Sequence, residues 1–360
     1  MNTALCDFSI PNESGKCYCM ICGVPYHRPV KQGERLNRAC GIDIPIEKHH
    51  RGPGDFIHTR ITRWLGEGVI LGCGCADKIR ELNEAGPCGV REQIESHTNY
   101  LCGKADEQGW WKEPTAEQGK RRLRWWKAFA ALPGRRQAVK QIILHACRQA
   151  ENAIRTNLHD YFDRVVVLAP EHRQEQYDRF TGDLKANGWP FKTPERYKGF
   201  IGDRMPTPEW WPHSAGHWGA TNAHIRVLES AINDGVGRLF VFEDDAILCP
   251  DFTRKVTEFL LRLPGNWDGL MLGCQHMAGP MQERPGVVRI ESAIRSHAYA
   301  VRGGYLRALY KHMSETDGIF DVAMSEIQKH WRVYAPQPHL IGQREGVSSV
   351  GGYWQGESWW

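Results

Sequence analysis

The second half of the sequence predicts an α/β domain built on an open, largely parallel sheet. Two short apolar runs, at 164–168 and 239–242, have the composition of buried strands, and helical patterns lie between them. Three acidic residues follow the second run directly. Strands that alternate with helices form parallel sheets, and ligands bind such sheets at the carboxyl ends of the strands. The acids therefore mark the expected binding edge.

The remaining elements follow from apolar spacing and helix-stop signals. A helix is expected after Pro170, and Asn187-Gly188 ends it. A second helix is expected over 219–233, and Asp251 is expected to cap a third helix. Further strands are expected at 270–272, 298–301 and 332–334.

The acidic cluster consists of Glu243, Asp244 and Asp245. Neighbouring carboxylates repel one another, and a strand end inside an α/β domain is partly shielded from water. A divalent cation relieves both costs, and oxygen ligands suit Mn²⁺ or Mg²⁺. On an extended chain Glu243 and Asp245 share one face while Asp244 faces the other, as in an Asp-x-Asp clamp. The alternative is a surface turn whose acids cap the next helix.

Several blocks over about residues 163–345 resemble glycosyltransferase family 25, which includes lipopolysaccharide sugar transferases and procollagen galactosyltransferase domains. Gly219 and His224 match the family's Gly-Cys-x-x-Ser-His helix, whereas Ala220 and Ala223 depart from it. The blocks are RVVVLAPEHRQEQYDRF, WGATNAHIRVLESA, LFVFEDDAILCPDF, NWDGLMLG, AYAV and RVYAPQPHLIGQ. The resemblance implies a GT-A fold, a nucleotide-sandwich domain that binds a nucleotide sugar, commonly a UDP-sugar, with Mn²⁺.

The resemblance also implies metal and catalytic roles. Glu243 and Asp245 become metal ligands, and Asp245 takes part in catalysis by holding the ion at the diphosphate. His339 stands where many GT-A enzymes place a late metal ligand; the alternative is a surface histidine. Asp321 is the candidate general base for the acceptor hydroxyl. The alternative for Asp321 is the N-cap of the helix DVAMSEIQKHW.

Donor binding is assigned to three side chains. Asp244 belongs to the metal and diphosphate site, and Arg173 pairs with the diphosphate or supports the nucleotide. His224 lies near the donor pocket, or is simply a hydrogen-bonded helix histidine.

The first 110 residues are predicted to form a separate cysteine-rich module. Nine of the 12 cysteines lie there. Because thiols stay reduced in cytoplasm, metal binding is favoured over disulfides, and a structural Zn²⁺ needs four S or N ligands. The alternative is a set of reduced, buried cysteines. The candidate ligands are Cys17, Cys19, Cys22, Cys40, Cys73 and Cys75. Residues 52–87 also resemble a small helical module of phage and bacterial proteins.

Residues 111–160 are predicted to be a basic helical connector. Basic side chains interleaved with Trp125 and Trp126 suit a nucleic-acid backbone with stacked bases. The alternative is a solvated helix face. Neither a signal peptide nor an apolar run long enough to span a membrane is evident, which predicts a cytoplasmic protein of a bacterial cell or a phage-infected host.

Together these features predict a glycosyltransferase domain over 161–360. It would move a hexose from a nucleotide sugar to a hydroxyl of a glycan, a protein or a hydroxymethylated DNA base. The alternative is a nucleic-acid-binding protein with an inactive transferase-like domain. A metal-dependent hydrolase is disfavoured because no paired histidine–carboxylate motif lies near the acids.

Overall fold

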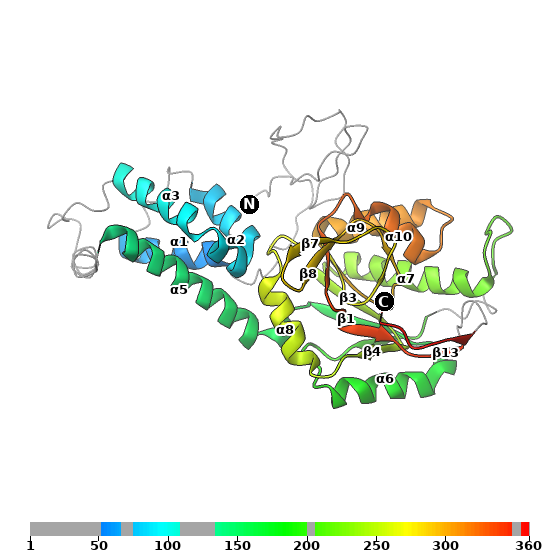
Figure 1. Cartoon of the computed structure of the whole chain (residues 1–360). Coiled ribbons are helices and arrows are strands. Elements are labelled where there is room, and N and C mark those ends of the chain that lie inside the picture. The colour runs from blue at the N-terminus through cyan, green and yellow to red at the C-terminus, as the bar shows by residue number, and fades with distance from the viewer. Residues whose placement is uncertain (1–51, 66–74, 109–133, 200–205, 348–353, 360) are drawn as a thin grey trace. The chain divides into compact units, whose positions relative to one another are not determined.

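The computed structural model describes residues 52–65, 75–108, 134–199, 206–347 and 354–359 (Figure 1). The described residues form two compact units. One contains 158–259 and the chain from Trp267 onward, and the other contains the N-terminal helices with 260–266. Five of the predicted zinc ligands, and the side chain of the sixth, Cys75, lie outside the description; the five are Cys17, Cys19, Cys22, Cys40 and Cys73.

The first unit is an α/β domain around an eight-stranded sheet. Six strands run in one direction and two, β10 and β8, run in the other, so the prediction of a largely parallel sheet is confirmed. In spatial order the strands are β2 (Glu195–Tyr197), β1 (Arg164–Leu168), β3 (Arg238–Glu243), β10 (Ala298–Arg302), β5 (Gly269–Met271), β11 (Val333–Pro336), β8 (Val287–Ile290) and β7 (Met281–Arg284).

Helices and short strand pairs complete this unit. The helices are η3 (Leu158–Asp160), η4 (Glu171–Arg173), α6 (Gln174–Ala186), α7 (Ala215–Asn233), α8 (Phe252–Arg262, of which 252–259 belong to this unit), α9 (Gly303–Glu315) and α10 (Phe320–Gln328). The strand pairs are β4 (Ala246–Leu248) with β12 (Ile341–Gln343), β6 (Gln275–His276) with β9 (Ala293–Ile294), and β13 (Gly346–Val347) with β14 (Trp354–Gln355).

The predicted strands overlap observed strands, with ends shifted by up to two residues, and the helix starts differ at two places. Helix α7 begins four residues earlier than expected because Ser214 caps it, accepting a hydrogen bond from the backbone N–H of His217. The second difference concerns Asp251, which was expected to cap α8. Its backbone carbonyl accepts the N–H of Lys255 at the start of the helix, while its carboxylate accepts a hydrogen bond from the side chain of Arg254.

Alternation along the strands separates two apolar layers. On β3, Leu239 and Val241 pack with residues of α7, α9 and α10 on one face of the sheet, while Phe240 and Phe242 lie on the opposite face. On that opposite face Phe240 stacks on Trp189, with ring centroids 5.8 Å apart. Phe242 is the last apolar residue before the acids and is fully buried. Its packing anchors the end of β3, which is Glu243.

The second unit is helical. It contains α1 (Pro53–Leu65), α2 (Cys75–Glu92), α3 (Ile94–Glu107) and α5 (Arg135–Thr156), which share a buried core. Helix α5 is the described part of the predicted basic connector. Arg136 and Lys140 on α5 both pair with Glu95, and Glu151 pairs with Arg91, so part of its charge is used inside the unit. No helix among the described residues is long and apolar enough to cross a membrane.

Candidate active site

A cavity of about 470 Å³ opens at the carboxyl end of β3. Its lining comes from the start of α6, from α7, from the loop before β10, from the start of α10 and from the β12–β13 region. Six residues predicted from the sequence line it, namely Arg173, His224, Glu243, Asp244, Asp245 and Asp321. The fold thus gathers one set of predicted residues from four separate segments. His339 is absent from this lining.

Asp244 is neutralised by an arginine. Its two carboxylate oxygens accept hydrogen bonds of 2.7 and 2.8 Å from Nε and Nη2 of Arg173, and the side chain is only 6% exposed. Burial raises the pKa of Asp244, and the guanidinium of Arg173 opposes that rise. The bidentate geometry holds both side chains in place. Two guanidinium nitrogens that the sequence assigned to a diphosphate therefore already bind Asp244.

Asp245 is the acid with an unsatisfied oxygen. Its Oδ2 accepts a hydrogen bond of 2.9 Å from Gln343 on β12, whereas its Oδ1 is buried without a hydrogen-bond partner. Burial and the negative charge of Glu243 raise the pKa of Asp245 to about 7. A buried carboxylate oxygen without a partner is costly, so this position favours a cation or a proton.

Glu243 is held by polar neighbours. Its Oε1 accepts a hydrogen bond of 2.7 Å from Ser296 and lies 3.5 Å from Nε2 of His224. Burial alone would raise the pKa of Glu243, but His224 and Ser296 outweigh burial and lower the pKa to about 2. Glu243 is therefore an ionised carboxylate that is already oriented toward the cavity, where its side chain keeps 31% exposure.

His224 has the geometry of a positioning residue. It is buried on α7, it stacks on Phe320 at 4.0 Å between centroids, and its Nδ1 lies 3.1 Å from the hydroxyl of Tyr299. Burial raises the pKa of Tyr299, which stays a phenol able to donate to Nδ1. Nε2 on the other side of the ring lies 3.5 Å from Oε1 of Glu243, so the two fixed neighbours set the orientation of the imidazole. His224 is hydrogen-bonded and lines the cavity, and its place beside a donor stays a prediction.

Asp321 lies across the cavity in the first turn of α10. The helix N-cap is Ile319, and the Asp321 carboxylate accepts the backbone N–H of Arg295 at 3.0 Å. The N-cap reading of Asp321 is therefore wrong, because the helix begins one residue before it. Arg295 has φ 78°, a strained value for a residue with a side chain, and such strain is common at functional sites.

The relative directions of the three acids differ from the sequence prediction. Alternation would turn Asp244 away from its neighbours, yet all three acids line the same cavity. The strand ends at Glu243, and Asp244 and Asp245 occupy a turn, where the two-residue period of a strand does not apply.

Further lining residues carried no motif in the sequence. Arg295 and Ser296 precede β10, while Gln343 and Arg344 lie at the end of β12. Each is close to the acids only through the tertiary fold, so spacing along the chain gives no signal for them.

The lining carries more acids than arginines. Six carboxylates and four arginines face the cavity. An anionic ligand such as a diphosphate would meet repulsion from this surplus unless a cation accompanied it. The donor set at Glu243 and Asp245, which is all oxygen, fits Mn²⁺ or Mg²⁺.

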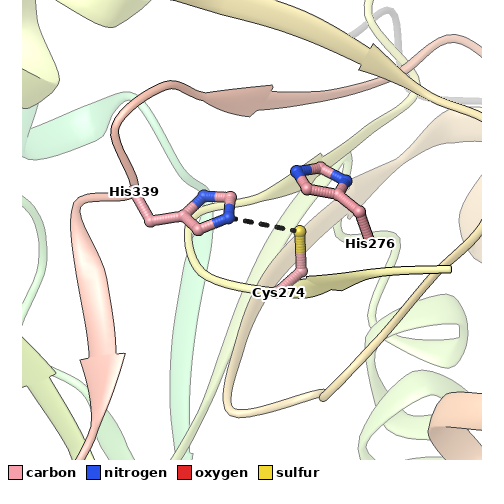
Figure 2. Close-up of side chains that lie close together, drawn as sticks. All are labelled: Cys274, His276 and His339. Atoms are coloured by element: carbon pink, nitrogen blue, oxygen red, sulfur yellow. Dashed lines mark hydrogen bonds between the residues drawn. The ribbon is translucent and has the colours of Figure 1, made fainter. Parts of the chain in front are cut away.

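His339 lies in a different cluster. Its Nε2 is 3.9 Å from the Sγ of Cys274, and His276 lies beside both (Figure 2). None of the three residues lines the cavity. The sequence could not show this grouping, because Cys274 and His339 are 65 residues apart.

Comparisons with known proteins give distant structural likenesses. No protein-family model and no curated protein matches the sequence, so the resemblance to family 25 stays a prediction. Solved structures similar to this chain include A197 from STIV, with 13% identity, a TM-score of 0.30 and coverage of 52% of this chain and 90% of that one. UDP-glucose pyrophosphorylase complexed with UDP-glucose has 13% identity and a TM-score of 0.28, covering 48% and 72%. A glycosyltransferase involved in the glycosylation of the major capsid of PBCV-1 has 14% identity and a TM-score of 0.31, covering 52% and 95%. Likenesses at these scores do not assign an activity, so the function must be inferred from the side chains.

Proposed function

We propose that this protein transfers a sugar from a nucleotide-sugar donor, a UDP-sugar, to a hydroxyl acceptor, with Mn²⁺ or Mg²⁺ bound by Glu243 and Asp245. The observation that carries the proposal is the buried, unpartnered Oδ1 of Asp245, a residue that lines a carboxylate-rich cavity together with the ionised Glu243. Oxygen ligands with this charge suit a hard divalent cation, which supplies electrostatic stabilisation of the departing diphosphate.

The chain's own groups divide the remaining tasks. Arg173 keeps Asp244 neutralised, which limits the negative charge that the diphosphate meets. Ser296 and His224 fix Glu243 so that no reorientation is needed when charge develops on the leaving group. Hydrogen-bond partners that hold a metal-binding carboxylate in place raise both the affinity for the ion and the reaction rate.

Asp321 is assigned the proton of the acceptor. The acceptor oxygen forms a bond to the anomeric carbon while the bond from that carbon to the diphosphate oxygen breaks, and the nucleoside diphosphate leaves. Asp321 takes the hydroxyl proton as the new bond forms. The N–H of Arg295 holds the carboxylate in place for this step.

The test is release of UDP from UDP-sugars by the full chain in the presence of Mn²⁺. Wild-type protein is expected to release UDP, and chelation of the metal or Asp245→Ala is expected to lower the rate by about 100-fold or more. Asp251→Asn is the matched control, because Asp251 is an exposed acid that pairs with Arg254 outside the cavity.

Acceptor classes are then compared with one active donor. A glycan, a serine- or hydroxylysine-containing peptide, and hydroxymethylated DNA are each added, and stimulation of UDP release identifies the class. If no donor in a panel of UDP-, GDP-, ADP- and CMP-sugars yields free nucleotide with Mn²⁺ or Mg²⁺, the proposal is wrong.

A further inference from the structure

A second group of metal-ligand side chains lies outside the cavity. Cys274 follows β5, His276 belongs to β6, and His339 lies between β11 and β12. Their ligand atoms all lie within 4.8 Å of one another (Figure 2). In Figure 2 the Cys274 sulfur points toward the His339 ring, and the His276 ring lies next to both. Three donors from three segments therefore converge on one point.

The backbone holds these segments together. The N–H groups of Leu340 and Ile341 both donate to the carbonyl of Leu272, at 3.0 and 3.1 Å, which ties the His339 segment to the Cys274 segment. Gly273 is tightly enclosed, since a Cβ there would lie 1.8 Å from the carbonyl oxygen of Ile341. Only glycine permits this approach, and it places Cys274 directly beside the His339 segment.

The three side chains are largely removed from water. Cys274 is fully buried and His339 is 9% exposed. The Nδ1 atoms of His276 and His339 are both buried without a hydrogen-bond partner. The Cys274 thiol meets Nε2 of His339 at 3.9 Å, a weak contact between two buried polar groups that a shared metal ion would replace.

We infer that Cys274, His276 and His339 bind a transition-metal ion, Zn²⁺, at a site separate from the acidic cluster. One thiolate and two imidazoles are ligands that Zn²⁺ prefers over Mn²⁺ or Mg²⁺. Bonds of about 2.0–2.3 Å place tetrahedral ligands about 3.3–3.8 Å apart. The 3.9 Å between the Cys274 sulfur and the His339 nitrogen is close to that separation, and the ligand atom of His276 lies within 4.8 Å of both.

Three protein ligands leave the fourth position to water. His276 is half-buried, and Met277 beside it is 59% exposed, so solvent reaches this side of the cluster. On this assignment His339 serves the zinc site and is unavailable to the ion at Glu243 and Asp245.

The experiment compares metal content among variants of the full chain. Because the N-terminal cysteines can also bind zinc, the difference between variants, rather than the total, reports on this site. Cys274→Ala and His276→Ala are each expected to bind one Zn²⁺ fewer per chain than wild type, with affinity for that ion reduced more than about 100-fold, beyond the ~10- to 100-fold loss from removing an outer partner. Cys249→Ala, a substitution of another buried cysteine of the same unit, is expected to bind as wild type does.

Co²⁺ provides a second readout. Wild-type protein should show a thiolate-to-cobalt absorption component that disappears in Cys274→Ala and weakens in His276→Ala, while Cys249→Ala keeps it. If Cys274→Ala fails to fold, the half-buried His276→Ala decides alone. Equal metal content and equal cobalt spectra in wild type and His276→Ala would overturn the inference. Mn²⁺-dependent UDP release is measured in the same variants. None of the three residues lines the cavity, so the outcome of this assay is independent of the outcome of the zinc measurement.

Discussion

Replacing Asp245 with asparagine removes the charge at the unsatisfied position and keeps the side chain's shape. In the metal-free protein the pKa of Asp245 is about 7, while Glu243 stays ionised with a pKa of about 2. A cation that binds both acids must therefore displace a proton from Asp245 below pH 7. Between pH 7.5 and pH 5.5 the ionised fraction of Asp245 falls ~25-fold, and the affinity for Mn²⁺ should fall by the same factor.

Electron paramagnetic resonance of free Mn²⁺ during a titration measures this affinity directly. The Asp245→Asn protein should bind Mn²⁺ more weakly at pH 7.5 and show little change between the two pH values, because asparagine has no proton to displace. Asp251→Asn should follow the wild type at both pH values. An unchanged wild-type affinity at pH 5.5, or a ~25-fold change that persists in Asp245→Asn, would refute the reasoning.

Three further outcomes follow from the structure. The pKa of Asp245 rises from 3.8 to about 7 on folding, so this carboxyl stabilises the fold below pH 4, and that stabilisation is lost as the pH rises through 7. Without metal, the Asp245→Asn protein should therefore be more stable than wild type at pH 8, by roughly 2–4 kcal/mol in urea unfolding, and equal stability would contradict this. Trp354 is an exposed ring that lines the cavity, so Trp354→Ala should weaken UDP binding in calorimetry by about 1–3 kcal/mol, whereas Trp210→Ala, an exposed ring outside the lining, should not. Phe240→Ala should lower the free energy of unfolding by about 3–5 kcal/mol, and a loss under 1 kcal/mol would exclude its place in the core.

Local patterns predicted the elements that depend on local physics. The run at Arg164–Leu168 is β1 residue for residue, because β-branched side chains in a buried strand leave a clear mark. The stop signal after α6 was equally clear, since Asn187 is the C-cap and Gly188 follows with φ 66°. The order of the strands in the sheet could not be predicted from local patterns. Nothing in 298–302 shows that β10 inserts antiparallel between β3 and β5, because that choice depends on contacts far apart in sequence.

The site was predictable in part for the same reason. Glu243, Asp244 and Asp245 are adjacent, so their mutual repulsion is visible in the sequence alone. Their partners are not adjacent, since Arg173 lies 71 residues before Asp244 and Gln343 lies 98 residues after Asp245. The sequence singled out Arg173, but as a partner of the diphosphate or a support for the nucleotide, and its pairing with Asp244 was not predicted.

The three adjacent acids have different environments, which explains how the fold tolerates them. Asp244 is balanced by the Arg173 guanidinium and Glu243 by hydrogen bonds, so neither needs a further cation to remain buried. Asp245 has only the amide of Gln343, and its Oδ1 has nothing. If the acids served stability alone, an uncharged residue in place of Asp245 would give a more stable fold, because burial and the charge of Glu243 disfavour the ionised form of Asp245. Asp245 therefore lowers the stability of the metal-free fold, and a bound cation would restore that stability.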